Sequence, residues 1–176
     1  MKRSVNEIQG MVLKAARGAG VPLGHGEDLA AVAAGLALAE GGLAELVAVL
    51  AGPHEVVPPV VGGEKLIFAN ARAILAGPLA LDAVQAGTDQ AELRGLDAPL
   101  ILKALADGRG NCGVEFQGDK VVVMRIEPQP LRQIEGPIEV NPDIWAVLER
   151  YSRKTFVPAS EASRLAGAGA GLTDND

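Results

Sequence analysis

The chain has 176 residues, enough for one compact domain with a real core but too few for a two-domain enzyme. Aromatic residues make up 3% of it, which disfavours base stacking, and its net charge of −6 repels phosphate backbones and anionic lipid surfaces. One cysteine excludes an intrachain disulfide, and with two histidines it excludes a four-ligand zinc site made of Cys and His alone. We therefore expect no metal, no nucleic-acid partner and no membrane partner.

The N-terminal sequence is typical of a cytoplasmic protein. Lys2 and Arg3 resemble the start of a secretion signal, but Asn6 and Glu7 follow before any apolar run develops. The most hydrophobic window, 29–38, has roughly half the length needed to span a bilayer. We expect a buried helix there and not a membrane anchor.

Residues 1–53 are predicted to form a helical subdomain. Ser4 and Glu7 make a capping box that begins a first helix, and a glycine-rich stop ends it. A Gly-His-Gly turn at 24–26 leads into a second, alanine-rich helix. Apolar spacing predicts a third, short helix over 43–50.

Residues 54–140 are predicted to contain a sheet. Pro58 and Pro59 bar a helix near the start of this region. Glycine-containing turns bracket a segment at 66–75 that is favoured as a strand, and a short helix is expected over 79–84.

Three further strands are expected at the end of this region, over 100–105, 112–117 and 120–126. The links between them, at 107–110 and 118–119, contain the Gly and Asp residues of hairpin turns. The sheet is therefore predicted to be mainly antiparallel.

Residues 141–176 are predicted to form a C-terminal helix and a Gly-rich tail. Asn141 and Pro142 supply the cap and the first position of the helix. The whole pattern predicts an α+β fold, with an N-terminal helical subdomain, a mainly antiparallel sheet, and a C-terminal helix and tail in one compact domain.

The tail has two interpretations. It is either a frayed chain end, or a segment that folds over a site or into a neighbouring subunit. Its Gly-x-Gly-x-Gly run at 167–171 lacks the preceding strand and following helix of a dinucleotide-binding loop. The phosphate-loop, zinc-protease and nucleophile-elbow patterns are absent as well, so we expect no cofactor.

Three residues are weak catalytic candidates. Cys112, near Arg109, would be a nucleophile if its thiol were exposed, but it is favoured as a small core residue facing inward with Phe116. His25 and His54 both lie at predicted turns, where a histidine titrates near neutrality. Both are favoured as solvated turn residues, because no carboxylate lies at a sequence spacing that would indicate a catalytic dyad.

Positive charge gathers near the C-terminal helix of this acidic chain. The helix dipole explains part of it, because cations stabilise a last turn. The alternative is a pocket for an anion or a carboxylate, which arginine binds with two hydrogen bonds. The candidate ligand-binding residues are Ser160, Glu161, Ser163 and Arg164.

Several short motifs are distributed over nearly the whole chain. They are Ser-Val-Asn-Glu-Ile at 4–8, Lys-Ala-Ala-Arg-Gly-Ala-Gly at 14–20, Ala-Gly-Pro at 76–78 with Asp82, Val-Pro-Ala-Ser-Glu-Ala-Ser-Arg at 157–164, the Gly-Ala run at 167–171 and Asp-Asn-Asp at 174–176. On these motifs the chain resembles a family of small uncharacterised bacterial proteins. That family has no assigned activity, so the resemblance implies no mechanism, but it makes the tail a family feature and thereby favours an ordered tail.

A second, local resemblance covers residues 7–46. Their two helices, joined through Ala-Gly-Val-Pro at 19–22, are similar to the N-terminal helical region of the malate and L-lactate dehydrogenase family. That family continues with Asp-Ser-His-Gly, whereas this chain has Glu-Gly-Gly-Leu-Ala-Glu at 40–45, without the histidine. The resemblance therefore implies shared helix packing at most.

The leading hypothesis is a cytoplasmic accessory or small-metabolite-binding protein, homo-oligomeric, whose partner is a small molecule or an enzyme. The alternative is a small hydrolase or isomerase that acts on a carboxylate-bearing metabolite. In that enzyme Arg164 would anchor the substrate, and His25, His54 or Cys112 would be acid, base or nucleophile. A third class is a structural interaction module whose tail docks on a partner.

Overall fold

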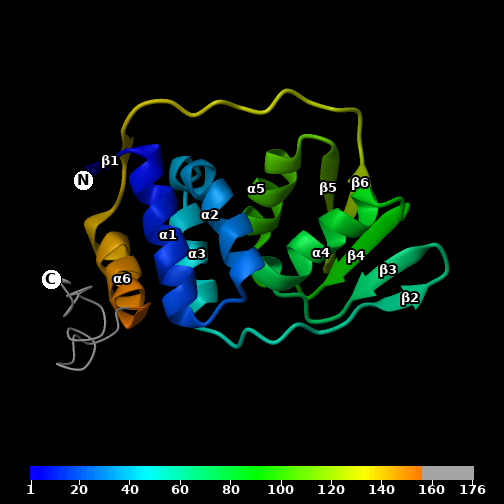
Figure 1. Cartoon of the computed structure of the whole chain (residues 1–176). Helices are drawn as coiled ribbons and strands as arrows, with labels where there is room; N and C mark the ends of the chain where they lie inside the picture. The colour runs from blue at the N-terminus through cyan, green and yellow to red at the C-terminus, as the bar shows by residue number, and fades with distance from the viewer. Residues whose placement is uncertain (156–176) are drawn as a thin grey trace, which may run out of the picture.

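The computed structural model of the protein describes residues 1–155. The predicted tail and the candidates within 156–176 lie outside the described residues. The predicted α+β class is confirmed: helices come first, a five-stranded, mainly antiparallel sheet follows, and a further helix comes after the sheet (Figure 1).

Helix α1, Val5–Ala19, forms where the local signals predict it. The Ser4 hydroxyl accepts a hydrogen bond from the Glu7 amide, and the Glu7 carboxylate accepts one from the Ser4 amide at 2.8 Å. These bonds satisfy two amide groups that a helix start leaves without partners. At the other end Gly20 has a φ of 86°, the left-handed conformation that ends the helix.

Helix α2, Leu23–Leu38, begins earlier than predicted. The expected turn at 24–26 is wrong, because these residues already form the first turn of α2 directly after Pro22. The glycine at 26 allows close packing, since a Cβ there would lie 3.4 Å from the Cβ of Ala16 on α1. Helix α3, Gly42–Leu50, matches the third predicted helix.

The five strands lie in the order β2-β3-β4-β6-β5. Only β3 and β4 run parallel, and the intervening chain includes helix α4; the other neighbours are antiparallel. Helices α4 and α5 pack on each other and on one face of the sheet, whereas no described helix covers the other face (Figure 1). The strands are β2 Val60–Gly62, β3 Lys65–Phe68, β4 Gln90–Arg94, β5 Cys112–Gln117 and β6 Lys120–Arg125.

Two predictions are wrong in the segment that forms helix α4, Ala73–Gln85. The helix includes the end of the segment expected as a strand over 66–75, and it begins six residues before the helix expected over 79–84. No neighbouring side chain caps its start; instead Asp97 accepts a hydrogen bond from the Ala73 amide at 2.8 Å. The helix start therefore depends on a contact between residues distant in sequence.

Helix α5, Pro99–Arg109, occupies the segment predicted as a strand over 100–105, so that prediction is wrong. Proline at the first helical position favours a helix. Glu45 of α3 also accepts a hydrogen bond from the Leu100 amide at 3.0 Å. The expected hairpin link at 107–110 is the end of this helix, where the glycine at 110 adopts a left-handed conformation.

The β5–β6 hairpin is confirmed, with its turn at Gly118 and Asp119. Cys112 is buried at the start of β5, but Phe116, predicted to face inward, is 52% exposed. Burial decreases along β5 towards the turn, so the end of the strand projects beyond the helices that cover its start.

The described chain ends on the helical side of the molecule. Strand β7, Ile138–Glu139, pairs with β1, Lys2–Arg3. Helix α6, Pro142–Ser152, then packs against α1, and the predicted Asn141 cap accepts a hydrogen bond from the Asp143 amide. A short 3₁₀ turn, Arg153–Thr155, follows.

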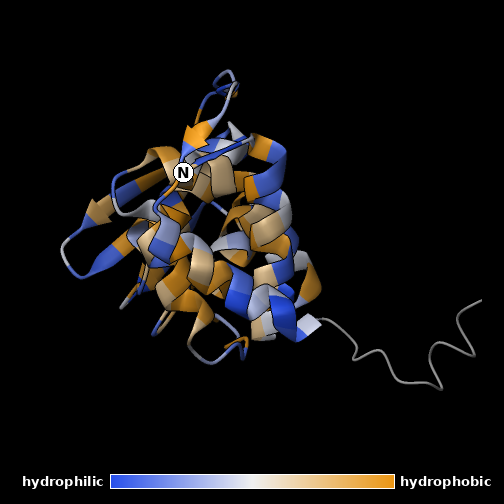
Figure 2. Ribbon diagram, turned by 90° about the vertical axis from the view of Figure 1, so that its left-hand side faces the viewer, coloured by the Kyte–Doolittle hydropathy of each residue, from blue (hydrophilic) through white to orange (hydrophobic). Residues whose placement is uncertain are grey.

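The core is built mainly from Ala, Leu and Val side chains and runs through both parts of the fold. The helices carry both apolar and hydrophilic residues (Figure 2). Helix α1 is buried along one face, whereas α4 is buried almost all round, with residues 73–78 all buried. None of the helices within residues 1–155 is long and apolar enough to cross a membrane.

Candidate functional site

A long connection without helix or strand crosses one side of the molecule (Figure 1). It comprises residues 126–137, called the strap here, and joins β6 to β7. Prolines at 128, 130 and 137 lack the amide hydrogen that a helix or a sheet ladder uses. The Gln129 amide donates to the Gly110 carbonyl at 2.6 Å, which ties the first part of the strap to the end of α5.

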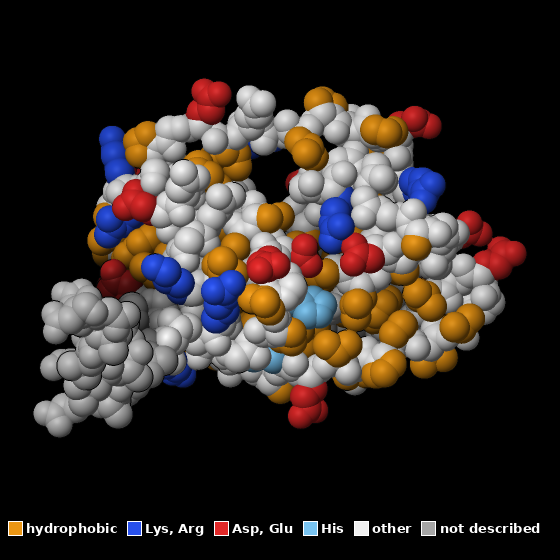
Figure 3. Space-filling view, viewed as in Figure 1, with side chains coloured by type: hydrophobic (Ala, Val, Ile, Leu, Met, Phe, Trp, Pro, Cys, Tyr) orange, Lys and Arg blue, Asp and Glu red, His pale blue; other side chains and the backbone are white. Residues whose placement is uncertain are grey.

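A cavity of about 490 Å³ lies between the strap, α2 and α5, and we call it the strap cavity. The space-filling view shows the molecule hollowed beneath the strap (Figure 3). Most of the lining residues are apolar. They are Ala31, Val32, Gly35, Leu36, Leu38 and Ala39 of α2 and its end, Leu100, Lys103, Ala104, Asp107 and Gly108 of α5, and Leu131, Arg132 and Ile134 of the strap.

Short side chains on the two facing helices create this space. Ala31, Gly35 and Ala39 recur every four residues and so follow one face of α2. A Cβ at position 35 would meet only the Ile134 Cδ1 atom, at 4.0 Å. Ala104 contributes a further short side chain, from α5. The strap therefore crosses the two helices without filling the gap between them.

Three ionisable side chains line the strap cavity. The Lys103 Nζ atom donates to both Asp107 carboxylate oxygens, at 2.9 and 3.1 Å. Arg132 takes part in none of the ion pairs within residues 1–155. The lining thus carries one positive charge in excess, in a protein with a net charge of −6.

A polar network joins α2, α4 and α5 and leads towards Cys112. The Arg109 guanidinium lies 2.9 Å from an Asp82 oxygen and 3.7 Å from an Asp28 oxygen. The network continues through Gln85, which binds both Arg109 and Asn111, and the Asn111 side chain lies 3.6 Å from the Cys112 sulfur.

Burial dominates the electrostatics of this network. It raises the pKa of Asp28, although the Arg109 guanidinium acts in the opposite direction. Burial likewise raises the pKa of the Cys112 thiol, against the smaller effects of Arg109 and Arg125. Both shifts favour the neutral form of the group.

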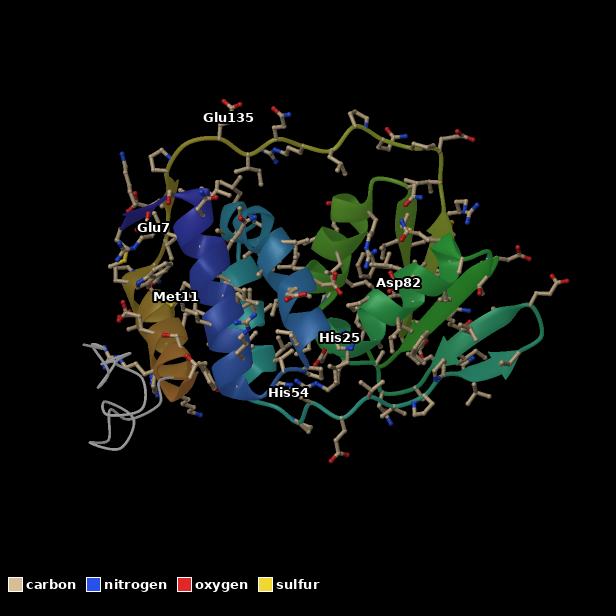
Figure 4. The ribbon with its side chains drawn as sticks, in the orientation of Figure 1. Glu7, Met11, His25, His54, Asp82 and Glu135 are labelled. Carbon is tan, nitrogen blue, oxygen red and sulfur yellow. The ribbon has the colours of Figure 1, made fainter. Side chains whose placement is uncertain are left out.

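The two histidines come from different elements (Figure 4). His25 is in the first turn of α2, one turn before Asp28, and its buried Nδ1 atom has no hydrogen-bond partner among the described residues. His54 lies on the segment after α3, where loss of water and the nearby Arg72 charge lower its pKa. No hydrogen bond or ion pair found within residues 1–155 joins His54 to Cys112, and neither histidine lines the strap cavity.

Sequence reasoning missed Glu92, a 1% exposed residue on β4. Its carboxylate pairs with Lys65 at 2.9 Å, with Arg94, and with Lys120 at 3.6 Å, all on the sheet face that no described helix covers. Hydrogen bonds from Lys65 and Arg94 hold the pKa of Glu92 well below its ordinary range, at about 2. The sequence feature that could have identified Glu92 is a single charged residue between apolar neighbours, in Ala-Glu-Leu.

Sequence reasoning also missed the strap cavity, because its lining carries no catalytic motif. The candidates Ser160, Glu161, Ser163 and Arg164 lie outside the described residues, so they stay predictions. Within residues 1–155, no group of three His, Cys, Asp or Glu side chains is placed to hold a metal ion.

Comparison with known proteins gives one match, which lies in the N-terminal part of the chain. No curated protein and no solved structure matches the chain significantly. One family model matches residues 3–74, which include α1 to α3 and the β2–β3 hairpin, and thus the α2 wall of the strap cavity but neither α5 nor the strap. Over residues 3–74 the predicted resemblance to an uncharacterised family is confirmed, and that family is described as a protein of unknown function (DUF3726).

Proposed function

We propose that this protein binds a small metabolite in the strap cavity. The observation that carries the proposal is a space of about 490 Å³ with mainly apolar walls and a few polar groups in its lining. Small-molecule sites have this size and this composition.

The strap also limits what kind of ligand fits. It passes over the cavity and is hydrogen-bonded to the end of α5, so a folded partner cannot approach the cavity from the strap side. A small molecule that binds in the cavity would remove the apolar walls from water. These features support small-metabolite binding over docking of a macromolecule at this place.

The test uses 1-octanol, a neutral apolar probe, and the thermal unfolding midpoint of the full chain. Binding to the native state alone raises the midpoint by linkage. We expect 1-octanol to stabilise the wild-type protein and not Ala104→Phe, whose ring would fill the cavity.

The matched control is Ala146→Phe, which adds the same ring at an exposed position of α6 that does not line the cavity. This variant should respond to 1-octanol like the wild type. The proposal fails if 1-octanol stabilises none of the three proteins, or if it stabilises all three equally.

A further inference from the structure

We propose that the strap cavity selects an organic acid, with an apolar alkyl or aryl body and one carboxylate held between Lys103 and Arg132. The proposal rests on the function proposed above and adds the chemical class of the ligand. It follows from the charge of the lining, from the nature of the walls and from the positions of the two cations.

The charge of the lining favours an anion with one negative charge. Of the three ionisable side chains, Lys103 and Asp107 pair with each other, so the positive charge of Arg132 is the excess. A single carboxylate balances that charge, whereas a phosphate or a dicarboxylate brings a second negative charge towards Asp107. An amine would add a third cation to the lining.

The walls favour a ligand whose remaining part is apolar. Val32, Leu100, Leu131 and Ile134 surround the space with groups that cannot form hydrogen bonds. A sugar or a zwitterionic amino acid would lose hydrogen bonds to water there without replacing them. An alkyl or aryl group gains free energy from the same walls.

The two cations reach the cavity from different elements. Lys103 belongs to α5 and Arg132 to the strap, so a carboxylate between them contacts both sides of the cavity. The planar arginine fork binds a carboxylate through two parallel hydrogen bonds, and Lys103 can donate a third while it stays close to Asp107. Arg132 is therefore expected to contribute more to affinity than Lys103.

The experiment compares three eight-carbon probes, octanoate, 1-octanol and octylamine, by calorimetric titration of the full chain. The wild type should bind octanoate about tenfold more tightly than 1-octanol, as expected for one charge-assisted contact. Arg132→Gln should abolish that preference, and Lys103→Gln should reduce it. Neither variant should change binding of 1-octanol.

Arg150→Gln is the matched control, since it removes an exposed arginine from α6, outside the cavity lining. It should keep the full preference for octanoate. Equal affinity for octanoate and 1-octanol, tighter binding of octylamine, or a preference that Arg132→Gln leaves unchanged would overturn the organic-acid proposal and leave cavity binding intact. Absence of binding by all three probes would overturn both proposals.

Discussion

At the residue scale, Glu92 shows how one buried carboxylate organises the open face of the sheet. Lys65, Arg94 and Lys120 come from three adjacent strands and converge on it. Without the carboxylate, these three cations would repel one another across neighbouring strands. The pairs therefore stabilise the folded state as long as Glu92 is ionised.

This arrangement predicts a specific dependence of stability on pH. The pKa of Glu92 falls from an ordinary 4.5 to about 2 in the folded protein. A lowered folded pKa adds stability that is fully present above the unfolded value and is lost as pH falls through the folded value. We expect Glu92→Gln to unfold at lower urea concentration than the wild type at pH 7, and the difference to shrink between about pH 4.5 and 2.

Glu115→Gln is the control for this prediction, because Glu115 is exposed on the same sheet face, on β5. Urea unfolding followed by circular dichroism at several pH values measures both variants. Glu115→Gln should leave the midpoint nearly unchanged at each pH. A Glu92→Gln difference that stays constant down to pH 2 would contradict the proposed role of the carboxylate.

At the element scale, helix α6 packs on α1 through a position that only glycine fits. A Cβ at Gly18 would overlap the Tyr151 carbonyl oxygen of α6. A backbone carbonyl cannot rotate away as a long side chain can, so the two helices would have to separate. Gly10, on the same helix, has open space at its Cβ position.

The two glycines make a matched pair of substitutions. Gly18→Ala should lower the free energy of unfolding by about 1–3 kcal/mol, the usual cost of overpacking. Gly10→Ala should raise it by about 0.5–1 kcal/mol, because alanine loses less backbone entropy in a helix. Urea unfolding measures both changes. Stabilisation by both substitutions would show that α6 does not approach α1 as closely as the structure describes.

Whether a helix could be predicted from the sequence depends on whether the groups that cap its start are close to it in the sequence. Helices α1 and α6 carry their caps at Ser4 and Asn141, next to their own first turns, and both were predicted. At the starts of α4 and α5, the Ala73 and Leu100 amides donate hydrogen bonds to Asp97 and Glu45, which lie 24 and 55 residues away in the sequence. Such caps exist only after folding, so the sequence predicted a strand at both helix starts.

The candidate site could not be predicted for a related reason. The strap cavity lies between the strap and two helices, where Ala and Gly residues leave space, and such residues have no chemical signature in a sequence. Sequence reasoning instead selected Cys112 and the two histidines, which are reactive residue types. The structure places Cys112 in the core, and neither histidine lines the cavity.

At the scale of the whole molecule, α4 and α5 connect the sheet to the N-terminal helices. They cover one face of the sheet, and both also pack against α2. Arg72, just before α4, adds a link, since its guanidinium donates to the Val49 carbonyl of α3 at 2.8 Å and lies 3.5 Å from Asp97. Neither end of the molecule can lose its structure without exposing apolar surface of the other.

We therefore expect the protein to unfold in one cooperative transition, and the chain has one natural probe at each end. Its only tryptophan, Trp145, is buried in α6 at the helical end, and its only cysteine, Cys112, is buried in the sheet. Tryptophan fluorescence, thiol labelling and circular dichroism should give the same urea midpoint. Labelling of Cys112 at lower urea than the fluorescence change would instead show that the sheet unfolds separately from the helical part.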